Sequence, residues 1–419
     1  MVKIAPPLIN VLPQNFLSID CSIDHYNSAL VYNIYVKLTK IIATLGPSCE
    51  SEELIEKLIL KGVNIFRFNF KHNTVEWHET MIQKVRTVAQ KNNLLVGTLI
   101  DLQGPEIRIL LKTDSLNIVE GKWYSLGDGC EISLTHPEVY SHLKEGQKAV
   151  VDDGAFDFEI VRKNGELGLL AKSSGKLGNR KTLIVPGGNF PVELLVDRDL
   201  KGLELAGRHK IDYVALSFVR SSEDIKSLKD QMNKHGVSSK IVAKIETQKA
   251  IQNLASIVEV ADIVMVARGD LGVEFPFEEV PYFQKMIIKE CLEKGVPVIT
   301  ATQMLESMIE NPYPTRAEIS DVANATFDLT DAVMLSAETA IGAHPSKAVA
   351  TMSRAVMFSE KITNDDVRLR HDYDVHDQTE LLCDAAYNLY FQYRKRKKIK
   401  AFIILTQTGK TARTLSRYR

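Results

Sequence analysis

The sequence has little of what marks disulfide-bonded, membrane-spanning or nucleic-acid-binding proteins. Its five cysteines are scattered among 419 residues without C-x-x-C spacing, which indicates free thiols in a reducing compartment. No apolar run approaches 18 residues, so no helix is expected to span a membrane. The 52 Lys and Arg residues balance 53 Asp and Glu residues. Because the formal net charge is only −1, we expect no nucleic-acid partner and no anionic membrane surface.

The remaining composition is that of an ordinary globular enzyme. Apolar residues make up 45% of the chain and charged residues 25%, which excludes a disordered or collagen-like protein. The first residues make a poor signal peptide, because Pro and Asn interrupt their apolar stretch. We therefore expect a cytoplasmic protein.

From residue 37 onward, short β-branched segments alternate with amphipathic segments of helical periodicity. Residues 51–62 are an example, with Ser51 placed to cap a helix and Gly62 to end it. Such alternation predicts parallel βαβ units, and eight strands before about residue 340 is the number in a (β/α)8 TIM barrel. The fold class is thus α/β. The predicted strands are 37–46, 63–70, 94–102, 212–219, 240–246, 262–268, 296–303 and 331–338.

Two regions depart from the alternation and define the expected domains. Residues 108–190 contain short alternating segments with Asp-Gly and Asn-Gly turns, which predict an all-β lid inserted into the barrel. The barrel itself is then 37–107 and 191–361. Residues 362–419 predict a helix, a strand at 400–409 and the start of another helix, an incomplete C-terminal α/β domain. Residues 1–36 fit no unit and are expected to form a loose arm.

Polar side chains occur at the ends of five predicted strands, where an active site forms in such barrels. Glu246 and Asp270 are hard oxygen donors suited to Mg²⁺ when a ligand supplies further oxygens. Lys244 and Arg67 supply the positive charge that phosphoryl transfer requires. The alternative is a rim of structural salt bridges. The converging residues are Arg67, Asn69, Lys71, Asp101, Lys244, Glu246, Arg268, Asp270, Thr300 and Thr302.

The same segments resemble the pyruvate kinase family, in the family's order, over about residues 37–419. The resemblance implies a barrel, a β lid after the third strand and a C-terminal α/β domain. It also implies transfer of phosphate from phosphoenolpyruvate to ADP in glycolysis, with Mg²⁺ as cofactor. The most specific segments are MVARGDLGVE and ATQMLESM, with KIIATLGPSCES, RFNFKHN and IDLQGPEIR in support.

Site roles follow from the resemblance, position by position. Lys244, Arg67 and Thr302 would be catalytic, and Gly269 and Asp270 would join them in binding substrate. Glu246 and Asp270 would hold Mg²⁺. The nucleotide would be bound by Asn69, Arg108, Lys181 and Asp153.

One departure from the family concerns K⁺, which many members bind through residues matching Asn69, Asp101 and the carbonyl of Leu102. Lys71 stands where a serine ligand is usual, and an ammonium group cannot ligate a cation. Our hypothesis is that Lys71 replaces K⁺ and makes it dispensable. The alternative is that Lys71 turns to solvent and K⁺ still binds.

Other departures bear on regulation and assembly. Thr182 and Ile184 replace smaller or polar residues where the chain returns from the lid, and we expect a stiffer hinge. Most of the family's C-terminal domain is missing, so we expect no sugar-phosphate activation and at most a weak anion site at 406–411. A homo-oligomer is expected: barrel contacts near 304–316 would support a dimer, and the sequence leaves open whether a tetramer forms. The competing functions are a non-catalytic paralogue and a Mg²⁺-dependent pyruvate-enolate aldolase.

Overall fold

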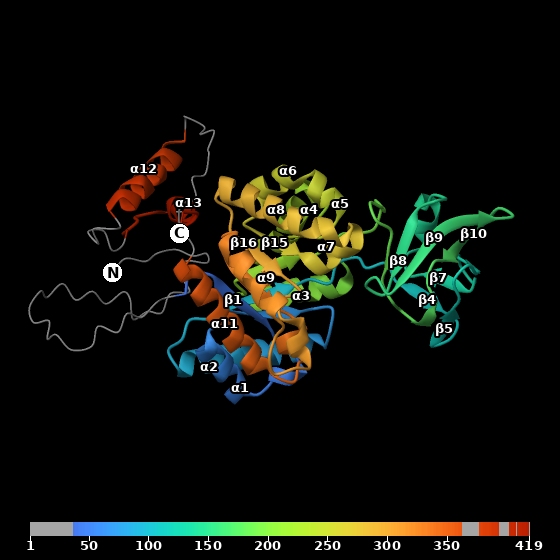
Figure 1. Ribbon diagram of the computed structural model, residues 1–419, viewed down its shortest axis with the longest axis horizontal. Coiled ribbons are helices and arrows are strands. Elements are labelled where there is room, and N and C mark those ends of the chain that lie inside the picture. The colour runs from blue at the N-terminus through green and yellow to red at the C-terminus, as the bar shows by residue number, and fades with distance from the viewer. Residues whose placement is uncertain (1–36, 363–376, 394–401, 408, 419) are drawn as a thin grey trace, which may run out of the picture.

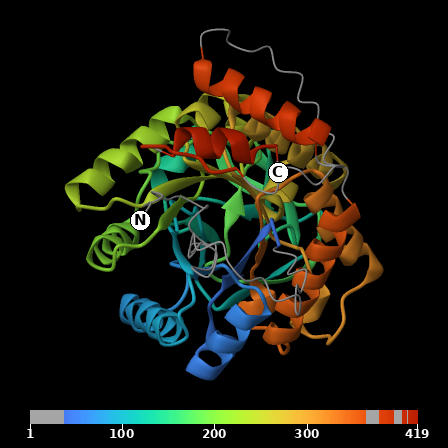
Figure 2. The same ribbon diagram turned by 90° about the vertical axis from the view of Figure 1, so that its left-hand side faces the viewer.

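Eight parallel strands close into a barrel in the computed structural model, which describes residues 37–362, 377–393, 402–407 and 409–418. The strand order around the barrel is β1-β17-β16-β15-β14-β13-β3-β2, and Figure 2 shows the helices surrounding it. The predicted (β/α)8 fold class is confirmed. The barrel strands are β1 (Lys40–Thr44), β2 (Ile65–Asn69), β3 (Gly97–Asp101), β13 (Tyr213–Leu216), β14 (Lys240–Ile245), β15 (Ile263–Ala267), β16 (Val298–Ala301) and β17 (Ala332–Leu335).

The first helix shows how the unpaired N–H and C=O groups at a helix end find hydrogen-bond partners. The Ser51 hydroxyl accepts from Leu54 N, and Gly62 ends the helix at φ 119°, a conformation favourable to glycine. The helices of the barrel are α1 (Glu52–Lys61), α2 (Val75–Lys91), α3 (Asp197–Arg208), α4 (Ser222–Lys234), α5 (Gln248–Gln252), α6 (Leu254–Val260), α7 (Arg268–Glu274), α8 (Val280–Lys294), α9 (Arg316–Phe327), α10 (Ala337–Ala340) and α11 (Pro345–Ile362).

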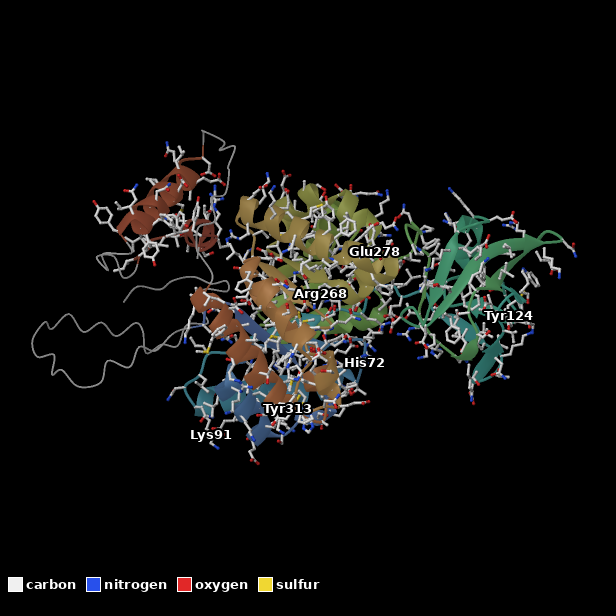
Figure 3. The ribbon with its side chains drawn as sticks, in the orientation of Figure 1. His72, Lys91, Tyr124, Arg268, Glu278 and Tyr313 are labelled. Atoms are coloured by element: carbon white, nitrogen blue, oxygen red, sulfur yellow. The ribbon has the colours of Figure 1, made fainter. Side chains whose placement is uncertain are left out.

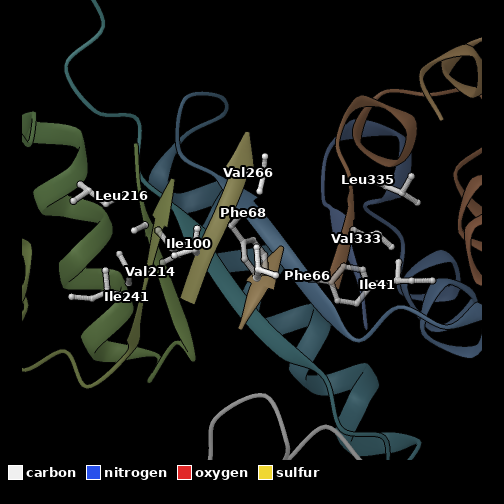
Figure 4. Packing of buried hydrophobic residues seen from close by; sticks show 14 of the residues in the cluster. Ile41, Phe66, Phe68, Ile100, Val214, Leu216, Ile241, Val266, Val333 and Leu335 are labelled. Carbon is white, nitrogen blue, oxygen red and sulfur yellow. The ribbon is translucent and has the colours of Figure 1, made fainter. Parts of the chain in front are cut away.

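Alternation along the strands divides the barrel core into two layers. On β2, Phe66 faces the helices and belongs to the large outer cluster, whereas Ile65 belongs to the cluster inside the barrel. Figure 4 shows the outer layer, where Phe66 lies near Ile41 and Val333. Because side chains alternate, Arg67 follows Ile65 on the inward face. The strand that builds the core therefore also delivers a cation to its carboxyl end.

The lid follows β3 and stands beside the barrel, joined to it by two segments (Figure 1). One five-stranded sheet, of order β12-β8-β9-β10-β6, and two strand pairs, β11-β5 and β4-β7, pack around a separate core that includes the fully buried Tyr124 and Phe158. The lid strands are β4 (Ile109–Leu111), β5 (Ser115–Ile118), β6 (Trp123–Ser125), β7 (Ile132–Leu134), β8 (Lys148–Val151), β9 (Phe156–Lys163), β10 (Glu166–Ala171), β11 (Gly175–Gly178) and β12 (Leu183–Ile184).

The C-terminal segments lie on the side of the barrel away from the lid (Figure 1). They contain α12 (Gln378–Tyr393) and α13 (Lys410–Ser416), which pack through Cys383, Tyr387 and Tyr418. The strand predicted at 400–409 was wrong for the part described, because residues 402–406 have no regular structure. A strand needs a partner to pair with, and the described C-terminal residues include no other strand. The predicted arm, residues 1–36, lies outside the described residues.

No helix within the described residues is long and apolar enough to cross a membrane.

Candidate active site

Four charged side chains form one network at the mouth of the barrel, the end where the carboxyl ends of the strands meet. Arg67 donates from Nε to Oδ2 of Asp101 at 2.7 Å, and its Nη2 lies 2.7 Å from the same oxygen. Nζ of Lys244 lies 3.4 Å from Oδ1 of Asp101 and 2.7 Å from Oε1 of Glu246. The barrel thus brings together four residues that the sequence analysis singled out.

Arg67 is also held from its other side. Its Nη1 donates to the hydroxyl of Thr44 at 2.9 Å, and that hydroxyl donates to the carbonyl of Leu335 at 2.9 Å. Thr44 ends β1 and Leu335 ends β17, the two strands whose pairing closes the barrel. The guanidinium therefore has fixed partners on both sides, as a preorganised phosphate site requires.

The network keeps its cations and carboxylates charged despite burial. Burial alone would lower the pKa of Lys244, but Asp101, Glu246 and Asp270 outweigh it and raise that pKa above the ordinary value. Burial would likewise raise the pKa of Asp101, but Lys244 and Arg67 lower it. Lys244 is therefore a permanent cation at neutral pH, suited to stabilising a phosphoryl group and unsuited to acting as a base.

Two residues of this network were missed by the sequence analysis. The Ser217 hydroxyl accepts a hydrogen bond from Lys244 Nζ at 2.8 Å. Phe218, at φ 56°, donates its backbone N–H to Oε2 of Glu246 at 2.7 Å. A left-handed conformation is costly for a residue with a side chain. The signal that could have found them is their position directly after a barrel strand, although neither residue type suggests this role.

Asp270 lies at the start of α7 beside this network. Its pKa is raised to about 7, first by burial and then by Glu246, whereas Lys244 and Lys71 act in the opposite direction. Two carboxylates that repel each other in a buried site suit a shared divalent cation. Among the described residues, no three His, Cys, Asp or Glu side chains could hold a metal ion by themselves. The donor set therefore fits Mg²⁺ only if a ligand completes the coordination.

Gly269 and Thr302 meet next to Asp270. The N–H of Gly269 donates to the Thr302 hydroxyl at 2.7 Å, and Thr302 has φ 68°. Arg268, labelled in Figure 3, fixes this turn, because its guanidinium donates to the Thr302 carbonyl at 2.6 Å and to Asp321 at 2.7 Å. Arg268 therefore holds the backbone of Thr302 in place.

Thr300 does not reach the mouth. It is fully buried and donates to the Thr330 hydroxyl at 2.9 Å, so its expected place at the mouth was wrong. Its neighbours Ile299 and Ala301 belong to the cluster inside the barrel and Val298 to the outer cluster, so strand alternation turns Thr300 toward the helices.

Lys71 lies on the β2 side of the mouth and is not turned to solvent. The side-chain Nζ of Lys71 lies 2.5 Å from Oε1 of Glu106, and the backbone N–H of Lys71 donates to Asn69 Oδ1 at 3.1 Å. The carbonyl of Leu102 accepts from the Ser217 hydroxyl at 2.8 Å. The groups assigned to K⁺ by resemblance, Asn69, Asp101 and Leu102, thus all have partners within the chain.

The predicted nucleotide residues fall into two groups. Arg108 pairs with Glu106 near Lys71 and Asn69. Lys181 belongs to the lid instead, where it pairs with Asp152 at 2.8 Å. Asp153 follows at φ 51°, and its charge contributes to the raised pKa of Asp270. The turn of the lid that carries Asp153 is therefore close enough to the mouth for its charge to act on Asp270.

Two cavities adjoin the site. One of about 90 Å³ lies between the barrel and the hinge of the lid, and its walls include Glu246, Asp270, Phe218 and Ile184. The other, of about 680 Å³, extends from Gly269 along α8 and α9 and is also lined by Asp153. Each cavity thus has walls from both the barrel and the lid, the smaller one at Glu246 and Asp270 and the larger one at the α7 turn.

Residues 36–349 match a family model that is described as "Pyruvate kinase, barrel domain". The chain belongs to the pyruvate kinase family. It is 39% identical to the pyruvate kinase of Thermotoga maritima over 393 residues, which cover 91% of this chain and 83% of that protein. It is 38% identical to that of Clostridium perfringens over 393 residues, covering 91% and 82%. A solved pyruvate kinase structure from Cryptosporidium parvum superposes with a TM-score of 0.85 at 33% identity, over 91% of this chain and 81% of that one.

Membership of the pyruvate kinase family makes the chain a phosphotransferase. It sets aside the aldolase considered from the sequence, since the matches extend over most of the chain rather than over the metal-binding strands alone.

Proposed function

We propose that this chain transfers the phosphoryl group of phosphoenolpyruvate to ADP, through the residues at the barrel mouth. The observation that carries the proposal is the arrangement of Lys244 and Arg67, two buried cations fixed by Asp101, beside the carboxylates Glu246 and Asp270. A phosphoryl group in transfer spreads negative charge over its equatorial oxygens, and fixed cations stabilise that charge without reorganising.

The roles proposed for the substrate-binding residues are those that the family resemblance implies, and their positions at the mouth support them. Arg67 binds the phosphate of phosphoenolpyruvate, and Lys244 stabilises the phosphoryl group while the bond to the enolate oxygen breaks. The N–H of Gly269 exchanges its present partner, the Thr302 hydroxyl, for the carboxylate of the substrate. The Thr302 hydroxyl, which donates to the Ala301 carbonyl at 2.6 Å, would then turn its proton toward the enolate carbon and assist its protonation.

Mg²⁺ would be held by Glu246 and Asp270, together with oxygens of the substrate. When bound, it supplies a fixed positive charge on the phosphoryl and carboxylate oxygens. The elevated pKa of Asp270 supports this assignment, because a cation there would relieve the repulsion between the two carboxylates.

ADP would enter between the barrel and the lid. Arg108 and Lys181 bind its phosphates from the two sides, with Asn69 and Asp153 nearby. Closing the lid excludes water, which would otherwise compete with ADP for the phosphoryl group.

Potassium is proposed to be dispensable, because Lys71 supplies its charge. Support comes from the partners already present: Asn69, Asp101 and Leu102 are engaged within the chain. The charge of Lys71 also reaches the metal site, since it lowers the pKa of Asp270 against the larger effects of burial and Glu246.

We further propose that the protein acts in glycolysis in the cytoplasm and forms a dimer. The four cysteines in the described residues are free thiols, as in reducing compartments. The proposed contact between subunits is at residues 304–316, where Tyr313, labelled in Figure 3, is 77% exposed.

The first experiment is to measure pyruvate formation from phosphoenolpyruvate, ADP and Mg²⁺, in tetramethylammonium buffer and then with K⁺. Equal turnover in both buffers is the expected result. Turnover only with K⁺ would refute the role of Lys71 while keeping the kinase. No turnover in either buffer, from protein that is folded by circular dichroism, would instead favour the non-catalytic paralogue.

A further inference from the structure

The carboxylate of Glu106 is shared between two cations at the root of the lid. Its Oε1 lies 2.5 Å from Lys71 Nζ, and its Oε2 pairs with Arg108 Nη2. Only 4% of the Glu106 side chain is exposed, whereas Arg108 and Lys71 are 25% and 33% exposed. A buried carboxylate needs one cation to remain charged, so the second cation is in excess of what Glu106 requires.

The two cations come from different parts of the fold. Lys71 lies just after β2 and belongs to the barrel. Arg108 lies where the outgoing chain enters the lid, donates from Nη1 to the carbonyl of Arg180 at 2.8 Å and pairs with Thr182 on the returning segment. Glu106 therefore joins a cation fixed to the barrel with a cation that belongs to the hinge of the lid.

The surroundings of Glu106 are positive. The pKa of His72 is lowered, first by burial and then by Lys71 and Arg67, with Arg108 adding to them and Glu106 acting in the opposite direction. Such a cluster of cations around one carboxylate suits a ligand that brings more negative charge than the carboxylate does.

We propose that Glu106 is a positioning residue that occupies Arg108 in place of a nucleotide phosphate and gives it up when a diphosphate binds. The proposal rests on the assignment of Arg108 to nucleotide phosphate in the proposed function. When Arg108 turns to the diphosphate, Lys71 remains on Glu106 and keeps the buried carboxylate neutralised. Without Lys71, releasing Arg108 would leave a buried carboxylate without a cation, which is strongly unfavourable.

This exchange predicts opposite effects of two substitutions on binding of Mg²⁺-ADP. Glu106→Gln removes the competitor for Arg108, so ADP should bind more tightly, by roughly threefold to tenfold. Lys71→Met leaves Arg108 as the remaining cation on Glu106, so ADP should bind roughly tenfold more weakly. The double variant Glu106→Gln with Lys71→Met has no carboxylate at position 106 that needs a cation. Its affinity for ADP should therefore equal that of Glu106→Gln alone.

The experiment is isothermal titration of the full chain with Mg²⁺-ADP in tetramethylammonium buffer, without phosphoenolpyruvate. Asp157→Asn, which removes an exposed lid ion pair with Lys148 at 2.9 Å, is the control of equal charge change and should leave the dissociation constant unchanged. If Lys71 contacted the diphosphate directly, the double variant would bind as weakly as Lys71→Met, and the exchange would be refuted. Unchanged or weaker ADP binding in folded Glu106→Gln would refute it as well.

A second comparison avoids Glu106→Gln, in case that variant does not fold. Lys71→Arg keeps a cation on Glu106, so it should restore the ADP affinity that Lys71→Met loses. A tenfold loss of ADP affinity in folded Lys71→Arg would overturn the proposal. Failure of the proposed function is distinguishable, because the unsubstituted chain would then bind no ADP or form no pyruvate.

Discussion

Lys244 and Glu246 lie two residues apart on and just after β14 and form an ion pair on the inward face, with Nζ 2.7 Å from Oε1. Lys244→Met should lower kcat by about 10³-fold, since it removes a fixed charge from the transferring phosphoryl group. KM for phosphoenolpyruvate should change far less, because Arg67 still binds the phosphate. Steady-state kinetics at saturating Mg²⁺ would measure both.

The matched control is at the opposite end of the same strand. Lys240 pairs with Asp262 at 2.9 Å, away from the mouth. Lys240→Met should leave kcat within about twofold and have a small effect on stability, as for other partly exposed pairs. Near-normal turnover of Lys244→Met would contradict its assigned role, and equal losses in both variants would point to general destabilisation.

Lys71→Ser should make the enzyme depend on K⁺. The substitution removes the ammonium 2.5 Å from Glu106 and supplies a hydroxyl that can ligate a cation. Activity in tetramethylammonium buffer should fall by about tenfold or more and recover on adding K⁺. A variant that is equally active with and without K⁺ would show that the charge of Lys71 is not needed.

Lys37 should give the protein a distinctive dependence of stability on pH. Its Nζ donates to the carbonyl of Gly62 at 2.7 Å, and its pKa is lowered to about 7, first by burial and then by Lys40. Below pH 7 Lys37 is protonated in both states, so the folded state carries the full cost of the buried charge. That cost disappears as the pH rises from about 7 toward 10.5.

Urea unfolding of the unsubstituted chain and of Lys37→Met would test this. The free energy of unfolding of the unsubstituted chain, relative to the variant, should rise with pH across that window, by no more than about 1.4 kcal/mol per pH unit. A difference that stays constant between about pH 7 and pH 10 would contradict the shift.

Gly187 should be sensitive to substitution because it clasps the returning hinge of the lid to α7. Its N–H donates to Oε2 of Glu274 at 2.9 Å, and it has φ 70°. An added Cβ would lie 2.8 Å from Gln248 Oε1. Gly187→Ala should lower the free energy of unfolding by about 1–2 kcal/mol and raise KM for ADP, as lid closure is disturbed.

Gly165→Ala provides the comparison, since Gly165 has φ 85° in the lid with no atom within 4 Å of an added Cβ. Gly165→Ala therefore introduces a similar backbone strain but no close contact of the kind that the new Cβ makes with Gln248 in Gly187→Ala. If both variants had the same kinetics, the hinge clasp would have no part in nucleotide binding.

The barrel was predictable because its strands carry a local signal. Each consists of β-branched and apolar residues followed by a capped amphipathic helix, as Ser51 and Gly62 show for α1. The segment 402–406 has the same kind of composition and forms no strand. Composition gives the propensity of a segment, but pairing requires a neighbour, which the pattern of one segment does not report.

The site was predictable in its residue types and not in its pairings. Arg67, Lys244, Glu246 and Asp270 could be placed from strand ends alone. That Lys71 pairs with Glu106 depends on the path of the chain into the lid, across 35 residues. The role of Phe218 depends on a left-handed backbone conformation that phenylalanine does not favour.

Thr44 has a consequence for the biosynthesis of this enzyme. Its hydroxyl joins Arg67 to the carbonyl of Leu335, across the seam where the first and last barrel strands meet. A ribosome-bound chain already carries Arg67, Asp101 and Thr44 before residue 335 has been made, yet the carbonyl that fixes the Thr44 hydroxyl is absent until β17 emerges. The support of Arg67 is therefore completed only when the barrel closes, and a nascent chain stalled before β17 should bind phosphate more weakly than the finished chain.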